Sequence, residues 1–186
     1  MKMLVLTKLL STVCIVFCGT FFTEAYSATP DKCDNTRNNE TAKCQEFNEK
    51  ALAIIEKFNN RIKSTAGEKN ADKWLKKLAP IYYETSRDLL YLISQSDIPA
   101  DLRDAALEFT QAMSDIGRLC AHAPHIPQGF CDAALTGIRK GAEGDMFGGN
   151  RELSKWRERL RAASENFEKK QENLNIVFIK HGIKFH

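Results

Sequence analysis

The stretch that decides the fold class is LSKWRERLRAASENFEKKQENLNIV, residues 153–177. Apolar side chains recur in it every three or four residues, with Lys, Arg and Glu between them, and this is the pattern of an amphipathic helix. The members of the apolar stripe are Leu153, Trp156, Leu160, Ala163, Phe167, Leu174 and Val177. We expect one long helix that Asn150 caps and Gly182 ends. Its apolar face needs partners elsewhere in the chain.

Three earlier stretches repeat the pattern and supply those partners. The first carries Cys44, Phe47, Ala51, Ile55, Phe58 and Ile62. The second, which Asn70 is expected to cap, carries Trp74, Leu75, Leu78, Tyr82, Leu89 and Ile93. The third starts near Pro99 and carries Leu102, Ala105, Phe109, Met113, Ile116 and Cys120. Proline lacks an amide hydrogen and clashes with the preceding turn, so Pro80 predicts a kink or a break near Leu78 or Ala79.

A further short helix is expected around Cys131, Leu135 and Ile138, before the glycine-rich stretch GAEGDMFGGN at 141–150. No stretch combines β-branched alternation with the turn residues of a hairpin. The sequence therefore predicts an all-α protein, an antiparallel helical bundle of about five helices.

The N-terminus has the features of a secretory signal peptide. Lys2 and Lys8 precede an almost unbroken apolar run at 9–22, and small residues follow at positions 25 and 27. We expect a signal peptide at 1–27, too short and wrongly flanked for a stable membrane span. The predicted location is periplasmic or extracellular.

Four cysteines remain beyond the signal, namely Cys33, Cys44, Cys120 and Cys131. An even number in an exported chain predicts two disulfides. If the first three helices run up, down and up, Cys44 and Cys120 lie roughly 30 Å apart. Bridged cysteines need Cα atoms about 5 to 6 Å apart. The expected pairs are therefore 33–44 and 120–131, provided that Pro80 does not fold the second helix back on itself.

The charge balance argues against a nucleic-acid partner. Without Lys2, Lys8 and Glu24, 25 basic and 23 acidic residues remain, which is no electrostatic footprint for nucleic acid. We expect a disulfide-containing helical domain at 28–142, followed by a connector and a C-terminal helix at 143–186 that packs on the same bundle.

The loop CAHAPHIPQGFC, residues 120–131, is the first candidate site. Structural zinc sites use closely spaced ligand pairs, and a bridged cysteine offers no thiolate, so we expect neither a metal site nor catalysis here. A stiff, closed loop loses little entropy on binding, which favours recognition through His122, His125 and Phe130. A plain connector is the alternative.

The glycine-rich stretch at 141–150 is the second candidate, because Met146 and Phe147 lie at its centre. It lacks the Lys-Ser/Thr ending of a phosphate-binding loop, and no cofactor is expected. Adaptable recognition is one interpretation. A connector whose Phe147 fills the core is the other.

Two motifs carry a family resemblance. In the first, Glu40 lies four residues before Cys44 and follows Cys33; in the second, Thr136 and Arg139 follow Cys131 by five and eight residues. Over residues 33–142 the chain resembles the exported four-cysteine helical domains named for the lysozyme inhibitor LprI. The family usually carries Trp and Arg in the helix before its third cysteine, where this chain has Ala112 and Ile116. The resemblance implies that the four cysteines, Thr136 and Arg139 are structural positions.

The sequence thus predicts a non-enzymatic exported binding protein with a protein partner, either lysozyme-like or from the cell envelope. The alternative is a structural or assembly factor of a bacterial envelope or secretion complex that uses the last helix. A weaker alternative is a small-ligand carrier with a cavity between Trp74, Tyr82 and Trp156. The sequence leaves the oligomeric state open.

Overall fold

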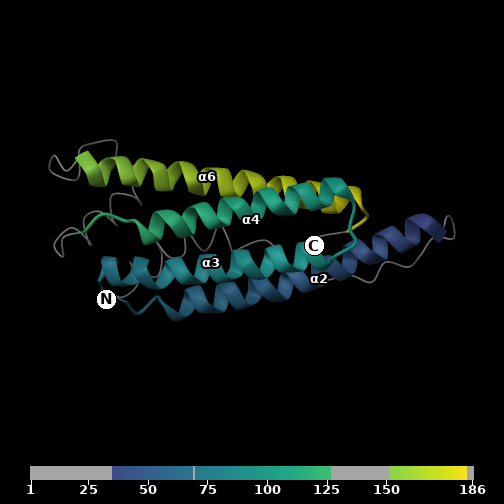
Figure 1. The fold of residues 1–186 in the computed structure, drawn as a ribbon, viewed down its shortest axis with the longest axis horizontal. Coiled ribbons are helices and arrows are strands. Elements are labelled where there is room, and N and C mark those ends of the chain that lie inside the picture. Colours follow the sequence, from purple (N-terminus) through teal and green to yellow (C-terminus); the bar gives the residue numbers. More distant parts are fainter. Residues whose placement is uncertain (1–34, 69, 127–150, 184–186) are drawn as a thin grey trace, which may run out of the picture.

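The computed structural model describes residues 35–68, 70–126 and 151–183, and within these ranges it is all-helical with no strand. The helices are α2 (Asn35–Ser64), α3 (Ala71–Gln95), α4 (Ala100–Ala121) and α6 (Arg151–Lys180). They lie side by side in an elongated bundle (Figure 1). None of these four helices has a stretch long and apolar enough to cross a membrane. The short helix expected near Cys131 lies outside the described residues, so the prediction of five helices is not supported.

The predicted apolar stripes form the core of the bundle. The larger cluster joins all four helices, and at its centre the rings of Phe109 and Phe167 lie 4.8 Å apart between centroids. A second cluster closes the end where α2 begins and α6 finishes, with Phe47 and Phe178 stacked at 6.0 Å. The 153–177 stripe therefore belongs to the bundle core, because Leu153 and Phe167 are buried and its other members are partly buried against the core clusters.

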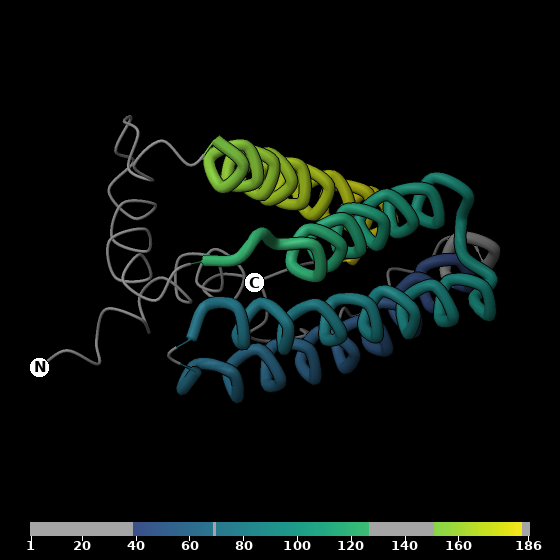
Figure 2. Tube along the Cα trace, turned by 60° about the vertical axis from the view of Figure 1, so that its left-hand side comes forward, coloured from purple at the N-terminus to yellow at the C-terminus, as the bar shows by residue number. Residues whose placement is uncertain are grey.

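The helices pack most extensively in the order in which they follow one another, α2 on α3, α3 on α4 and α4 on α6 (Figure 2). Gly117 allows α3 and α4 to approach closely. A Cβ atom at Gly117 would lie 2.9 Å from Cβ of Tyr82 and 3.5 Å from the carbonyl oxygen of Ala79. Small residues at this crossing therefore set the distance between the two central helices.

The helix ends form as the sequence indicates. The side chain of Asn70 caps α3 by accepting a hydrogen bond from the backbone N–H of Lys73 at 3.0 Å. At the end of α6, Gly182 has a φ of 85°, and the N–H of Ile183 donates to the carbonyl oxygen of Phe178 at 3.0 Å. This is a Schellman motif, in which glycine takes the left-handed position and the next apolar residue packs back on the helix.

The break that Pro80 predicts does not occur, because α3 runs unbroken from Ala71 to Gln95. Pro80 itself is exposed, so its ring faces away from the core. Its neighbours on both sides are buried, namely Leu78, Ala79, Ile81 and Tyr82. Burying these side chains on both sides of the proline offsets its cost in a helix of about 3 kcal/mol.

The structure does not support the two predicted disulfides. Cys44 and Cys120 are free thiols, 0% and 3% exposed, and each packs among apolar side chains as a small hydrophobic group. Helix α2 already begins at Asn35, so Cys44 lies about 13 Å along the helix axis from its start. This separation opposes a bridge to Cys33, which, like Cys131, lies outside the described residues.

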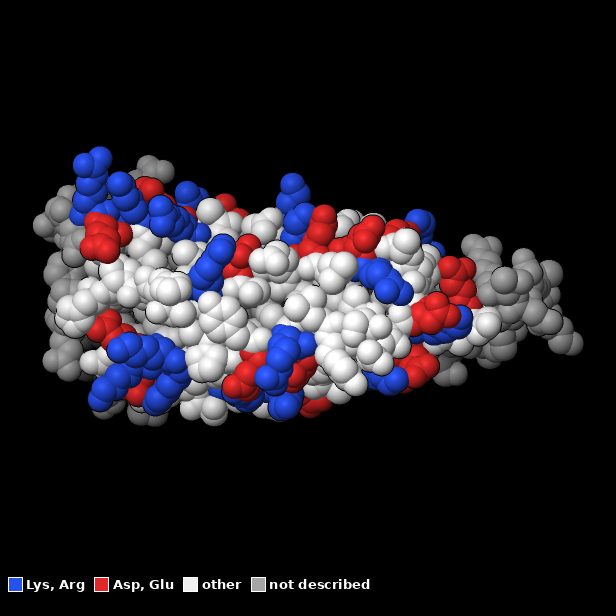
Figure 3. Space-filling view, in the orientation of Figure 1, with Lys and Arg blue, Asp and Glu red and all other residues white. Residues whose placement is uncertain are grey.

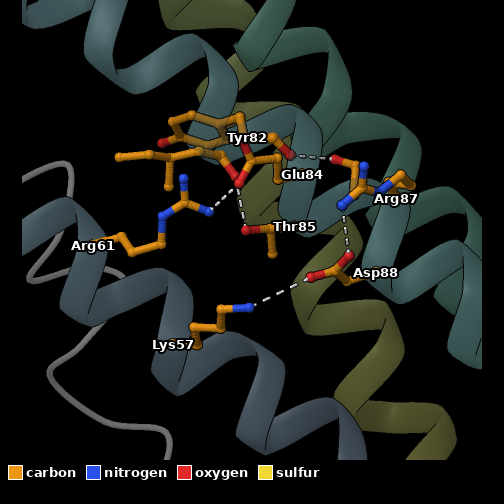
Figure 4. A network of polar contacts seen from close by, with 9 residues as sticks. Lys57, Arg61, Tyr82, Glu84, Thr85, Arg87 and Asp88 are labelled. Carbon is orange, nitrogen blue, oxygen red and sulfur yellow. Dashed lines mark hydrogen bonds and ion pairs between the residues drawn. The ribbon is translucent and has the colours of Figure 1, made fainter.

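A row of charged side chains joins α2 to α3 on the surface (Figure 4). Nη1 of Arg61 lies 2.6 Å from Oε2 of Glu84, and Nζ of Lys57 lies 3.9 Å from Oδ2 of Asp88. These groups are partly or largely solvated, and such pairs stabilise a fold by less than about 1 kcal/mol each. Apolar packing between the two helices therefore contributes more to the stability of the bundle than these pairs do.

Candidate functional site

The described part of the first candidate loop is anchored on Asp72, in the first turn of α3. The N–H of Ile126 donates to Oδ1 of Asp72 at 2.9 Å, and Nδ1 of His125 lies 2.5 Å from Oδ2. Both carboxylate oxygens are thus used to hold two successive loop residues. The chain that leaves α4 is tied to the start of a helix more than fifty residues earlier.

A second set of contacts holds the same segment from the side of α6. Ile126 packs with Leu153 and Trp156, and Leu153 is 1% exposed. Nε1 of Trp156 donates to the carbonyl oxygen of Leu119 at 2.9 Å, near the end of α4. The loop therefore leaves the bundle from a position that α3, α4 and α6 all define.

The two histidines of this segment point outward. The side chain of His125 is 79% exposed although one ring nitrogen contacts Asp72, and His122, which ends α4, is exposed as well. Two imidazoles on a backbone that is already fixed lose little entropy on contact with a partner.

The anchor has an electrostatic consequence. The backbone N–H of Ile126 is the main cause that lowers the pKa of the Asp72 carboxyl below its ordinary value, and His125 contributes in the same direction. A hydrogen bond to the charged form favours that form. Asp72 is therefore ionised over the physiological pH range and holds the loop throughout it.

The described part of the site has one thiol, Cys120, which is buried. Among the residues that the structure describes, no group of three or more His, Cys, Asp or Glu side chains is arranged to hold a metal ion. Burial raises the pKa of the Cys120 thiol to about 12. A nucleophilic cysteine needs a lowered pKa and access to solvent, and Cys120 has neither.

A similar anchor at the opposite end of the bundle was not apparent from the sequence. Asp101, in the first turn of α4, lies 2.5 Å from Nζ of Lys180 and 2.9 Å from Nε2 of His181. These contacts lower the pKa of Asp101 to about 2. Each bundle end thus has an aspartate at a helix N-terminus that holds a histidine just beyond a helix C-terminus. Only the pairing of distant helices brings these groups together, so no local pattern reveals them.

Charge is unevenly distributed along the bundle. We call the segment with His122 and His125 the histidine loop. The half of the bundle next to it holds eleven basic and six acidic side chains. This half consists of residues 58–68, 70–82, 113–126 and 151–165. The other half, residues 39–57, 83–112 and 166–183, holds eight basic and twelve acidic ones. Figure 3 shows basic side chains gathered toward one end of the molecule. Among the residues that the structure describes, the half next to the loop is therefore net positive and the other half net negative.

The three aromatic residues considered as the lining of a ligand cavity take part in core packing among the described residues. Trp74, Tyr82 and Trp156 pack in the main core, and both indole N–H groups are bonded, that of Trp74 to the Thr65 hydroxyl at 3.0 Å. A cavity of about 60 Å³ lies among α2, α3, α4 and α6, beside Phe47 and Phe178.

The remaining predicted site residues lie outside the described residues. They are Phe130, Met146 and Phe147 of the candidate binding loops, and Thr136 and Arg139 of the family motif. The geometry of the site is therefore that of its first half, His122 to Ile126, together with Asp72, Leu153 and Trp156.

Comparison with known proteins gives no assignment, since no family model matches the chain and no curated protein or solved structure is significantly similar to it.

Proposed function

We propose that this chain is an exported, non-enzymatic binding protein that contacts a protein partner through the loop following α4. The observation that supports this best is the anchored segment: Asp72 and Ile126 fix its backbone while His122 and His125 stay exposed. A preformed, outward-facing segment loses less entropy when it docks than a flexible loop would.

The signal-like N-terminus supports export to the periplasm or the extracellular space, and this is part of the proposal. It is tested by expressing the full chain in a bacterium and sequencing the N-terminus of the protein recovered from the periplasm. Cleavage near residue 27 is the expected result. Titration of thiols in the recovered protein then shows whether Cys44 and Cys120 remain reduced after export.

Within this class, the resemblance to the LprI domains suggests that the partner is a lysozyme. The positive end of the bundle carries the loop, so a lysozyme with an acidic surface fits it better than a strongly basic one. The proposed partner is therefore a lysozyme with an acidic surface.

The test is inhibition of cell-wall lysis across a panel of basic and acidic lysozymes. We expect inhibition within the acidic members, and loss of it in a His122→Ala/His125→Ala variant. The matched control is Lys169→Ala/Glu172→Ala on α6, which changes two exposed positions of the negative half and leaves the loop intact. Full lytic activity across the whole panel would end the lysozyme proposal.

A helical assembly factor is the second candidate. It is favoured by two large apolar side chains at the end of α6, since Ile176 and Ile179 are each 59% exposed. A photo-crosslinking residue placed at Ile176 in the expressing cell would form a discrete adduct with an envelope protein. An adduct there and none from position 122 would favour this candidate over the loop-binding one.

A further inference from the structure

The cavity beside Phe47 and Phe178 is lined by all four described helices, and we call it the α2–α6 cavity. Its lining runs from Phe47 to Ile55 on α2 and from Gln171 to Phe178 on α6. These spans are about 12 Å and about 10 Å along the two helix axes. Helices α3 and α4 supply the other lining residues. The cavity thus follows the line along which α2 and α6 face each other.

The order of helix packing explains why space remains there. Among the described helices, α2 packs extensively only on α3, and α6 only on α4. Helices α2 and α6 meet instead through side chains such as the rings of Phe47 and Phe178, 6.0 Å apart between centroids. Because α2 has one extensive neighbour, moving it requires less free energy than moving α3 or α4. A ligand larger than the cavity can therefore be admitted by a shift of α2.

The lining of the α2–α6 cavity is mostly apolar. Leu89 and Ile93 of α3 and Phe109 of α4 contribute buried side chains to it, and no charged side chain lines it. An ionised ligand would lose its hydration there without gaining a counter-ion, so the lining favours a neutral ligand. The volume of about 60 Å³ is well below the roughly 150 Å³ of an apolar cavity that binds benzene. The apolar part of a ligand is therefore a short aliphatic chain.

Three amide side chains also line the α2–α6 cavity. They are Asn48 of α2 and Gln171 and Asn175 of α6, all half-buried. None of the three forms a hydrogen bond with another residue that the structure describes. Residues four positions apart share one side of a helix, as Gln171 and Asn175 do. An amide side chain both donates and accepts hydrogen bonds, and a hydroxyl group does the same. A neutral hydroxyl is therefore the polar group that matches this part of the lining.

We propose that the α2–α6 cavity binds a small aliphatic alcohol, whose chain lies beside Phe47, Phe109 and Phe178 and whose hydroxyl bonds to the amides of Asn175 and its neighbours. The site is separate from the histidine loop, so a failure of either proposal leaves the other standing. Binding of the alcohol would also hold α2 to α6, where the two helices have no extensive contact of their own.

The test is a titration of the purified protein with ethanol, 1-propanol and 1-butanol, followed by NMR of the backbone and side-chain amides. We expect saturable shifts of the side-chain amide signals of Asn48, Gln171 and Asn175. Each added methylene should tighten binding by up to about fourfold while the chain still fits. Butyrate has a similar chain with a charged group, and it should bind at least about tenfold more weakly than 1-butanol, because no cation lines the cavity.

Two matched pairs of variants locate the site. Ala51→Leu places a larger side chain in the lining of the cavity and should weaken 1-butanol binding about tenfold or more. Ala53→Leu makes the same change at an exposed position of α2 outside the lining and should leave binding unchanged. Asn175→Ala removes a lining amide and should weaken binding several-fold. Asn173→Ala, at an exposed position of α6, is its control.

Circular dichroism checks that each variant keeps its helices, and the Asn175 pair tests the site even if Ala51→Leu disturbs the fold. Shifts that do not saturate would overturn the proposal. So would equal weakening by the two members of either pair, or butyrate binding as tight as that of 1-butanol.

Discussion

Asp72 and Ile126 are fifty-four residues apart in the chain, yet the backbone N–H of one donates to the carboxylate of the other at 2.9 Å. The contact joins the first turn of α3 to the segment that leaves α4. It makes the start of the histidine loop part of the folded bundle. The exposed histidines therefore have a defined position, although they lie outside the helices.

Two substitutions of Asp72 should loosen this segment to different degrees. Asp72→Asn keeps an oxygen that can accept from the Ile126 N–H but loses the charge that faces His125. Asp72→Ala loses both contacts. We expect hydrogen exchange of the Ile126 amide to accelerate strongly in the alanine variant and only weakly in the asparagine variant. Equal exchange in all three proteins would contradict the anchor.

Asp101 should make stability depend on pH in the acidic range. Its pKa is about 2 in the folded protein, below the ordinary value of 3.8, so its contribution is fully present above the ordinary value. The contribution is lost as the pH falls from about 4 toward 2. Asp101 is more than one third exposed, so we expect Asp101→Asn to cost only about 0.5 to 1 kcal/mol at pH 7.

The measurement is urea unfolding of the wild-type protein and the Asp101→Asn variant at pH 7 and at pH 2.5. The difference between the two proteins should shrink at the lower pH, because Asp101 is then partly protonated in the folded state. A difference that is constant or larger at pH 2.5 would show that the ionised carboxylate does not stabilise this end of the bundle.

Gly117→Ala should destabilise the bundle by about 1 to 3 kcal/mol, because the added methyl group would meet Tyr82 at 2.9 Å. Alanine is otherwise the better helix former, so a neutral result would mean that α3 and α4 separate without cost. Gly67→Ala is the matched control, since nothing lies within 4 Å of a Cβ atom there. Thermal unfolding of both variants checks the difference.

The two described thiols should be unreactive in the folded protein. Cys44 is 0% exposed, and burial is the largest cause that raises its pKa; for Cys120 burial raises the pKa to about 12. We expect slow reaction with a thiol reagent under native conditions and rapid reaction in denaturant. Rapid labelling of either cysteine in the native protein would show that the core is open at that site.

The helices were largely predictable from the sequence, because each apolar stripe is a local pattern that reports which face is buried. The stripe from Leu153 to Val177, the cap at Asn70 and the end at Gly182 are all of this kind, and the structure confirms them for the described residues. A kink or a break was expected near Pro80. The break does not occur, and the reason is that local propensity takes no account of the burial on both sides of the proline.

The candidate site was less predictable, for a physical reason. The loop sequence marks His122 and His125, but their anchor is a carboxylate on another helix. An acidic residue in the first turn of a helix is common, so Asp72 gives no sign in the sequence that it contacts the loop. The disulfide prediction relied on export and on cysteine count. It gave less weight to the place of Cys44 and Cys120 in the apolar stripes, where the structure buries both.

The order of helix packing also determines which helix unfolds most readily. Helix α2 has only α3 as an extensive neighbour, whereas α3 and α4 are each packed between two others. The free energy required to open α2 alone is therefore smaller than that of global unfolding. A partly unfolded form that keeps α3, α4 and α6 would expose the apolar faces of Phe47 and Phe58 to proteases first. Helix α2 is therefore the described helix that we expect to open first, and the anchor of the histidine loop on α3, α4 and α6 does not depend on it.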